Sequence, residues 1–287
     1  MRSAIDAGTV LITDASSELG QELARQLSRR ARTLVLVAHR EDQLEALREE
    51  LLLHNPTLGV VVEPCDLSRP EAVLALLETL QRDLVRVDVL VNLAYPGDPG
   101  LYEEEPWERI HQAMQEGLTA PLLLTHRLVR RMVKRRWGGL LHIEVGGVRP
   151  FAPGRAVRAA TQRFLEEFTE SLRLELWGTG VVVTQVMPGP VEAATAGAEE
   201  APAWLRISAA RCAREAIAGF DGAEPRVVPG WTYRWLSRLS SLLPRGVRRA
   251  AHLGAVRRLR AGPELAHPSP ETAMGEGSAR GLLTTSS

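Results

Sequence analysis

A turn rich in hydroxyl and carboxylate side chains follows the first apolar run of the chain. It reads TDASSELG, from Thr13 to Gly20. Turns in this position hold nucleotide phosphates when glycines let the backbone approach them and a helix N-terminus presents its amides. Here the turn holds a single glycine, Gly20, and two acids, Asp14 and Glu18, and acids at a helix start satisfy those amides themselves. The turn therefore indicates a phosphate site spoiled by two negative charges, or two acids that only cap the helix.

A second pair of polar residues, Arg158 and Gln162, lies four positions apart in a helical pattern. Arginine stays protonated far above neutral pH, so Arg158 can polarise a carbonyl oxygen or bind an anion but does not cycle a proton. Gln162 can contact a hydroxyl group but carries no charge. Other groups able to transfer a proton lie nearby in the sequence; they are His142, Glu144, Tyr95 and Tyr102. The two-residue period of a strand turns Glu144 away from the face of Val145, and we expect His142 to be structural.

Short β-branched runs alternate with long helical patterns along the first 230 residues. The strands are expected at Thr9–Thr13, Thr33–Ala38, Val60–Val62, Val87–Leu93, Leu140–Val145 and Val181–Val186. The helices are expected at Glu18–Arg30, Glu41–His54, Pro70–Gln81, Glu104–Arg135 and Arg155–Trp177. Nearly continuous apolar strands between helices are typical of a parallel sheet buried on both faces. The sequence predicts a doubly wound, Rossmann-like sheet in a three-layer α/β/α domain.

Several segments carry a family resemblance. They are TDASSELG, VDVLVNLA (Val87 to Ala94), the helical segment Phe168 to Leu176, and VTQVMPGPV (Val183 to Val191). Together they resemble the short-chain dehydrogenase/reductase family over roughly two-thirds of the chain. The resemblance implies hydride transfer with a nicotinamide cofactor and a catalytic tetrad of Asn, Ser, Tyr and Lys. In this sequence the four tetrad positions are held by Gly117, Val145, Arg158 and Gln162, so none of the family's catalytic groups is intact.

The resemblance also implies a set of cofactor-binding positions. They are Thr13, Ser16, Ser17, Gly20, Arg40, Asp66, Asn92, Ala94, Pro188 and Gly189. Family members that select NADP place a base near Arg40 for the 2′-phosphate, and Asp66 stands where the family contacts the adenine. Ala193 replaces a threonine expected near the nicotinamide. With Asp14 and Glu18 at the phosphates, we expect no cofactor or only weak NADP(H) binding.

The sequence is compatible with three functions. The leading hypothesis is a protein without redox catalysis that acts as a binding or scaffold subunit. It would form homo- or hetero-oligomers with related subunits through the helices at 104–135 and 155–177, the latter with an apolar stripe of Phe164, Leu165, Phe168, Leu172 and Leu176. The alternative is an NAD(P)-dependent oxidoreductase acting on a small or lipid-like carbonyl or alcohol. A third is contact with an anionic membrane surface through residues 231–262, which hold eight arginines and no acid.

Composition sets the remaining expectations. The 287 residues divide into a domain at 1–230, a basic amphipathic extension at 231–262 and a disordered tail at 263–287. The formal net charge is zero, which argues against nucleic-acid binding. The two cysteines, Cys65 and Cys212, form no motif and are expected to be reduced and buried; no metal site is expected. Without an apolar run near the ~20 residues of a membrane span, we expect a cytoplasmic protein.

Overall fold

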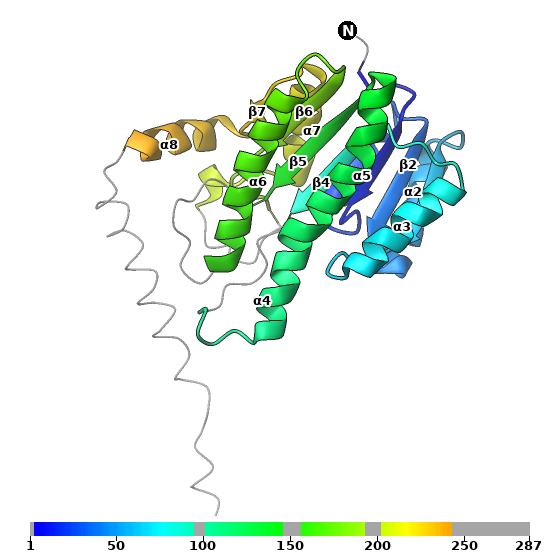
Figure 1. Cartoon of the computed structure of the whole chain (residues 1–287). Helices are drawn as coiled ribbons and strands as arrows, with labels where there is room; N and C mark the ends of the chain where they lie inside the picture. Colours follow the sequence, from blue (N-terminus) through cyan, green and yellow to red (C-terminus); the bar gives the residue numbers. More distant parts are fainter. Residues whose placement is uncertain (1–2, 95–100, 146–155, 193–201, 243–287) are drawn as a thin grey trace, which may run out of the picture.

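The computed structural model describes residues 3–94, 101–145, 156–192 and 202–242. Seven parallel strands form one sheet in the order β3-β2-β1-β4-β5-β6-β7. They are β1 (Thr9–Thr13), β2 (Thr33–Ala38), β3 (Gly59–Pro64), β4 (Val89–Ala94), β5 (Gly138–Glu144), β6 (Val181–Val186) and β7 (Arg226–Val227). The order reverses at β1, as in a doubly wound fold, so the predicted fold class is confirmed (Figure 1).

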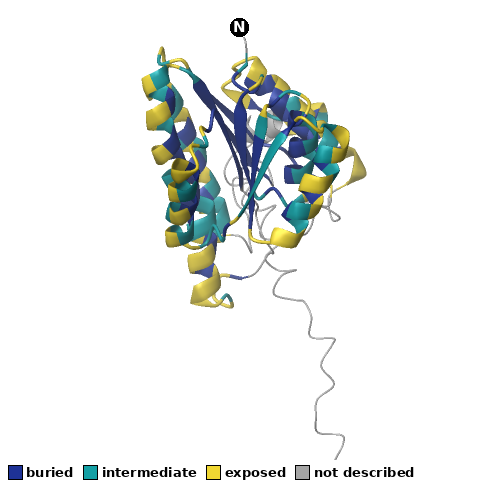
Figure 2. Cartoon of the chain, turned by 90° about the vertical axis from the view of Figure 1, so that its right-hand side faces the viewer, coloured by how far each residue is buried: buried dark blue, intermediate teal, exposed yellow. Residues whose placement is uncertain are grey.

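Helices cover both faces of the sheet (Figures 1 and 2). They are α1 (Glu18–Leu27), α2 (Glu41–His54), α3 (Pro70–Arg82), α4 (Trp107–Met114), α5 (Ala120–Arg135), α6 (Ala156–Glu175), α7 (Ala209–Asp221) and α8 (Trp231–Leu242). The apolar residues of α1, α2 and α7 pack on one face, and those of α3, α5 and α6 pack on the other. Figure 2 shows the buried strands between these two layers.

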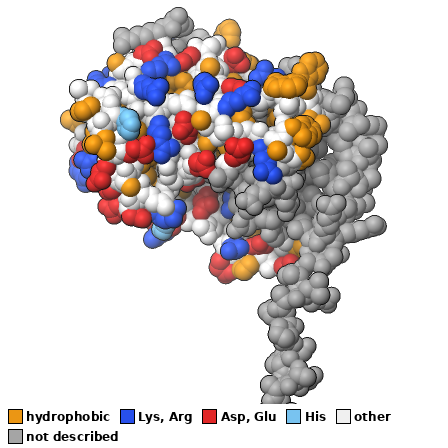
Figure 3. Space-filling model, turned by 180° about the vertical axis from the view of Figure 1, so that it is seen from behind, with side chains coloured by type: hydrophobic (Ala, Val, Ile, Leu, Met, Phe, Trp, Pro, Cys, Tyr) orange, Lys and Arg blue, Asp and Glu red, His pale blue; other side chains and the backbone are white. Residues whose placement is uncertain are grey.

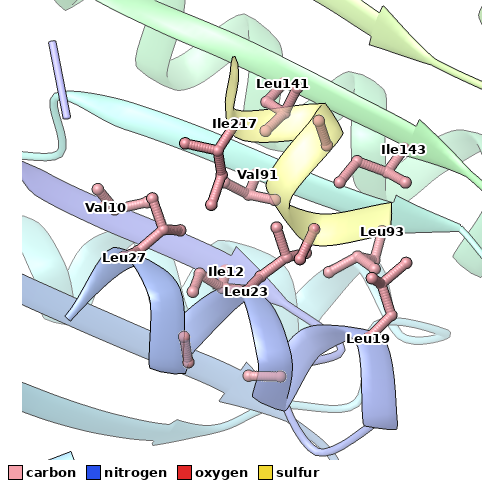
Figure 4. Packing of buried hydrophobic residues seen from close by; sticks show 14 of the residues in the cluster. Val10, Ile12, Leu19, Leu23, Leu27, Val91, Leu93, Leu141, Ile143 and Ile217 are labelled. Carbon is pink, nitrogen blue, oxygen red and sulfur yellow. The ribbon is translucent and has the colours of Figure 1, made fainter. Parts of the chain in front are cut away.

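The core between α1, α7 and the sheet follows from the sequence period of each element. Leu19, Leu23 and Leu27 recur every four residues on α1 and are fully buried. They meet alternate residues of the central strands, such as Ile12 on β1 and Val91 on β4 (Figure 4). This packing fixes the start of α1 at the carboxyl end of β1, where a doubly wound sheet binds its ligands.

Three features of this fold were not predicted from the sequence. Strand β7 and helix α7 were not predicted. The helix expected at Glu104–Arg135 begins at Trp107 and contains a π-helical segment, Gln115–Thr119, between α4 and α5. Gly117 in this segment lies so close to α6 that a Cβ there would stand 3.1 Å from the Thr161 hydroxyl. The change from α-helix to π-helix coincides with this contact between Gly117 and α6. Sequence periodicity alone does not reveal the change.

Helix α8 begins where the sequence predicts a basic extension. Its Tyr233 is buried, whereas Trp231, Trp235 and Leu236 are exposed, as is Trp204 from the 3₁₀ turn Ala203–Leu205. The view from behind shows hydrophobic side chains gathered at this edge of the molecule (Figure 3). The expected tail at 263–287 lies outside the described residues. In the described parts of the chain, no helix has the length and hydropathy needed to cross a membrane.

Candidate cofactor and substrate cleft

The turn after β1 keeps the backbone shape of a glycine turn although its first glycine is absent. Asp14 adopts φ 50°, in the left-handed region that glycine prefers and that aspartate tolerates better than most residues. Gly20 is required at its place, because a Cβ there would stand 2.4 Å from the Asp14 carbonyl oxygen. Ser17 caps α1 by accepting a hydrogen bond from the Gly20 amide at 3.1 Å, and its hydroxyl donates to the Asp14 carbonyl.

A cavity of about 300 Å³ opens beside this turn, at the carboxyl ends of the strands. It is lined by Asp14, Ala38, His39, Cys65, Asp66, Leu67, Leu93, Gln112, Glu116, Gly117 and Arg158. These residues come from the ends of β1 to β4, from α4, from the π-helical segment and from α6. Of the expected cofactor positions, Asp66 lines the cavity, and the cavity joins it and Asp14 to two of the tetrad positions, Gly117 and Arg158.

The four positions of the implied tetrad come together in space. Gln162 donates from Nε2 to the carbonyl oxygen of Val145 at 3.0 Å. Arg158 forms an ion pair with Glu116, with 3.9 Å between Nη2 and Oε2, and Glu116 precedes Gly117. Val145 is fully buried and offers no hydrogen-bonding side chain. The site thus has a guanidinium and an amide at the positions where the sequence resemblance implies a phenol and an amine.

Three carboxyl groups (Asp14, Asp66 and Glu116) and the guanidinium of Arg158 line the cleft, and Arg40 acts on Asp14 from outside the lining. Burial, together with the negative charge of Glu116, raises the pKa of Asp14 from 3.8 to about 7, while Arg40 and the Ser17 hydrogen bond act in the opposite direction. Asp14 therefore titrates near neutral pH, well above the range of an ordinary carboxyl group. Glu18 is exposed and does not line the cavity. Of the two acids at the phosphate turn, only Asp14 faces the cleft, and it carries less charge than the sequence implied.

Among the other expected cofactor positions, Asp66 stands at the mouth of the cavity. Its Oδ1 accepts hydrogen bonds from the amide and the hydroxyl of Ser68, at 2.9 and 2.6 Å. Burial raises the pKa of Asp66, but these bonds and the charges of His39 and Arg69 outweigh burial, so the net pKa is lowered. Asp66 is thus an ionised acceptor at neutral pH. Arg40 is exposed at the start of α2.

The remaining positions have structural partners. Thr13 bridges two strands, since its hydroxyl accepts from the Leu93 amide at 2.9 Å and donates to the Val91 carbonyl. The Ser16 carbonyl accepts from Gln21. Asn92 is buried with no recorded partner for its Nδ2 among the described residues. Pro188 and Gly189 are buried in the turn after β6, and Ala94 ends β4.

Other groups named as proton carriers lie away from the cavity. His142 is buried beside Thr169 of α6, and burial lowers its pKa to about 4. Glu144 is buried and accepts from Gln185 on β6 at 2.8 Å, and burial raises its pKa to about 8. Both lie on the face opposite Val145, as the strand period predicts. Tyr102 is exposed, and Tyr95 lies outside the described residues.

The sequence did not single out Glu116 as a site residue. It sits next to Gly117 in a segment expected to be regular helix, and only the π-helical turn and the cavity lining reveal its role. π-helical turns are frequent at functional sites. Cys65 also lines the cavity; burial raises its pKa to about 11, so it is a neutral thiol. In the described parts of the chain, no cluster of His, Cys, Asp and Glu is suited to hold a metal ion.

Comparison with known proteins identifies the fold and its relatives. The family model described as short chain dehydrogenase matches residues 8–204. An uncharacterized oxidoreductase of Myxococcus xanthus is 35% identical over 187 residues, which is 64% of this chain and 72% of that protein. An NADP-dependent 3-hydroxy acid dehydrogenase of Escherichia coli is 28% identical over 63% of this chain and 72% of its own length. A short-chain dehydrogenase of Sphingobium yanoikuyae, solved in complex with NADPH, is 27% identical with a TM-score of 0.69, covering 91% of this chain and 98% of its own.

These findings contradict the leading hypothesis of a protein without redox catalysis that acts as a scaffold. The relatives are named as oxidoreductases and dehydrogenases, and one was solved with NADPH. The hypothesis also counted Asp14 and Glu18 as two full charges at the phosphates, whereas Asp14 is partly neutral and Glu18 lies outside the cavity. Membrane contact through residues 231–262 gains no support from these relatives.

Proposed function

The chain belongs to the short-chain dehydrogenase family, and we propose that it is an NADP(H)-dependent oxidoreductase acting on a small or lipid-like carbonyl or alcohol. One observation carries the proposal: a single cavity connects the turn after β1 with Arg158 at the tyrosine position. A protein that acts only as a scaffold would not need a cavity that links these two positions. NADP(H) is favoured over NAD(H) because Arg40 follows β2 and because relatives named above use or bind the phosphorylated cofactor.

The residues of the cleft fit a dinucleotide. The adenosine end would meet Asp66 and Leu67, and the 2′-phosphate would meet exposed Arg40. The pyrophosphate would lie at the start of α1, where helix amides favour anions. Asp14 keeps the left-handed backbone of a glycine turn, and its neutral form removes most of the repulsion. The fit therefore depends on protonation of Asp14.

When bound, a nicotinamide cofactor supplies or accepts the hydride. The protein must handle the proton that accompanies it, because reduction of a carbonyl to an alcohol consumes one hydride and one proton. Because Asp14 would stand beside the pyrophosphate, water entering the open cavity would supply or take up this proton. Arg158 stays protonated and would donate hydrogen bonds to the carbonyl oxygen, stabilising the negative charge that develops there.

We propose in addition that the chain assembles with a second copy of itself through α5 and α6. Phe164 of α6 is exposed and stacks on Phe168 with 6.2 Å between ring centroids, whereas Leu165 of the expected stripe is buried against the sheet. The stripe is thus split between the core and the surface. Light scattering of wild type and Phe164→Glu tests this; a wild-type monomer would contradict it.

The function is tested by calorimetric titration with NADPH and NADH near pH 6 and pH 8. We expect micromolar NADPH binding at pH 6, weaker NADH binding, and NADPH affinity about tenfold lower at pH 8. Arg40→Ala should reduce the preference for NADPH, whereas Arg48→Ala, an exposed arginine on the same helix α2, should not. Failure of both cofactors to bind at millimolar concentration at either pH would overturn the proposal.

A further inference from the structure

A second cavity, of about 330 Å³, lies between α3 and α5. It sits at the amino end of β4, at the edge of the sheet opposite the candidate cleft. Leucine and valine side chains line most of it; they are Leu74, Leu77, Leu80, Leu84, Val85, Val87 and Leu128. Its volume falls at the lower end of the range of small-molecule sites, roughly 300–1,000 Å³. Figure 1 shows α3 and α5 on the same face of the sheet.

Four arginines surround this apolar groove: Arg86, Arg127, Arg131 and Arg135. The acids near it are Glu78 in its wall and Asp88 beneath it. Asp88 is buried; its Oδ2 accepts from the Thr9 amide, and its Oδ1 lies 3.3 Å from Arg86 Nε and 3.2 Å from Arg135 Nη2. The groove therefore has more positive charge than its own acids balance.

The arginines also repel one another. Burial lowers the pKa of Arg135, and although Asp88 raises it, the charges of Arg86 and Arg131 lower it further. Arg86 and Arg135 are held by Asp88. Arg131 donates to Gln81 Oε1 through one amino group, and no ion pair of Arg127 is recorded among the described residues. Arg127 and Arg131 are thus the guanidiniums best able to meet an anion in the groove.

Leu84 marks the mouth of the groove by two unusual properties. It has φ 55°, a left-handed conformation that costs a leucine free energy, and its side chain is 88% exposed. If this position served only to end helix α3, glycine or asparagine would adopt the left-handed conformation at a lower cost in free energy. An apolar side chain held in water beside an apolar groove gains burial when a ligand fills that groove.

We propose that this groove binds an amphipathic anion with one unbranched acyl chain and a carboxylate head. The chain would lie along the leucines of α3 and under Leu84, and the carboxylate would pair with Arg127 and Arg131. Arginine suits this role because its planar fork matches a carboxylate. An inorganic anion would leave the apolar walls unused, and a two-chain lipid is too large for the volume.

Calorimetric titration with decanoate, hexanoate and acetate tests the proposal in the full chain. We expect decanoate to bind, and affinity to fall about fourfold for each methylene removed. Equal affinity for acetate and decanoate, or no binding of decanoate, would overturn it. Decanol should bind at least tenfold more weakly than decanoate, and equal binding would exclude a role for the arginines.

Matched variants locate the site. The pair Arg127→Glu and Arg131→Glu should weaken decanoate binding at least tenfold, whereas Arg48→Glu, an exposed arginine on α2, should not. Leu84→Ala should weaken it several-fold, and Leu53→Ala, equally exposed on α2, should not. If the double variant fails to fold, Arg127→Gln alone applies the same test. Unchanged decanoate affinity in the arginine variants would refute the assignment.

Discussion

The ring of Tyr233 in α8 packs directly on Gly189 in the turn after β6. A Cβ on Gly189 would stand 2.7 Å from two carbons of that ring, and Tyr233 is buried although its neighbours Trp231 and Trp235 are exposed. The contact fastens the start of the basic segment to a turn that the family places beside the nicotinamide. Glu215 adds a second attachment, since it accepts from the Gly230 amide at 3.0 Å. Position 189 therefore controls the placement of α8.

Gly189→Ala should loosen α8 and destabilise the protein by about 1–3 kcal/mol, the usual cost of an added methyl group in a packed site. The measurements are chemical denaturation and the rate of tryptic cleavage after Arg234, which should rise. Gly222→Ala is the matched control, because the nearest atom to its new Cβ would lie 3.5 Å away, an ordinary contact. An unchanged cleavage rate in Gly189→Ala would show that α8 does not depend on this contact.

Asp14 predicts a pH dependence of cofactor affinity. Its pKa of about 7 means that the carboxyl is neutral below that pH and ionised above it. Glu116, Arg40, Arg158, His39 and Asp66 are the charged and titratable groups around it. NADPH affinity should therefore fall about tenfold between pH 6 and pH 8. This fall corresponds to about 1.4 kcal/mol of repulsion between the ionised carboxylate and the phosphates.

Asp14→Asn should remove this dependence, because asparagine keeps the size and the left-handed backbone but never ionises. Titration of NADPH against both proteins at the two pH values measures the effect. Glu18→Gln is the control and should retain the wild-type dependence, since Glu18 is exposed outside the cavity. An identical pH profile in wild type and Asp14→Asn would show that Asp14 does not meet the phosphates.

Glu144 predicts a loss of stability as pH rises from mildly acidic values to about 8. Burial raises its pKa from 4.5 to about 8; Glu166 raises it too, while the Gln185 hydrogen bond, Arg226 and Arg163 lower it. A carboxyl whose pKa is raised on folding stabilises the folded state fully below its unfolded pKa of 4.5, and that contribution is lost as pH rises from there to about 8, above which both states are ionised. The melting temperature should therefore fall between about pH 5 and pH 8.

Glu144→Gln should flatten that fall, because the glutamine oxygen still accepts from Gln185 and no charge has to be buried. Thermal melts across the same pH range measure it. Glu167→Gln, an exposed position on α6, serves as the control and should melt like wild type. A fall of equal size in Glu144→Gln would assign this loss of stability to other groups.

The sheet was predictable because its strands are buried on both faces, so β-branched runs and helix periods identify them directly. Sequence spacing also predicts that Gly117, Val145, Arg158 and Gln162 stand at the tetrad positions; Gln162 contacts Val145 and Arg158 pairs with Glu116 beside Gly117, while the match to the tetrad stays a prediction. Two things did not follow. The π-helical segment at Gln115–Thr119 involves a contact with Thr161, more than forty residues away, and the partial neutrality of Asp14 depends on burial and on Glu116. The local sequence pattern assigns a residue to a strand or a helix, but the protonation state of its side chain depends on neighbours that are distant in the sequence.

Arg158→Tyr with Gln162→Lys should raise an existing activity. The pair supplies a phenol that can transfer a proton and an amine that lowers the phenol's pKa, which the resident guanidinium and amide do not provide. Lysine at 162 can still donate to the Val145 carbonyl, so the end of β5 should remain in place. General acid–base groups typically contribute ~10²–10⁴-fold, and with Val145 unchanged we expect at least about a tenfold gain in kcat. Steady-state oxidation of NADPH with a carbonyl substrate measures it, with Gln162→Lys alone as the control that should gain little. A double variant that binds NADPH normally but turns over no faster than wild type would mean that proton transfer does not limit the rate, and would direct attention to hydride transfer or product release.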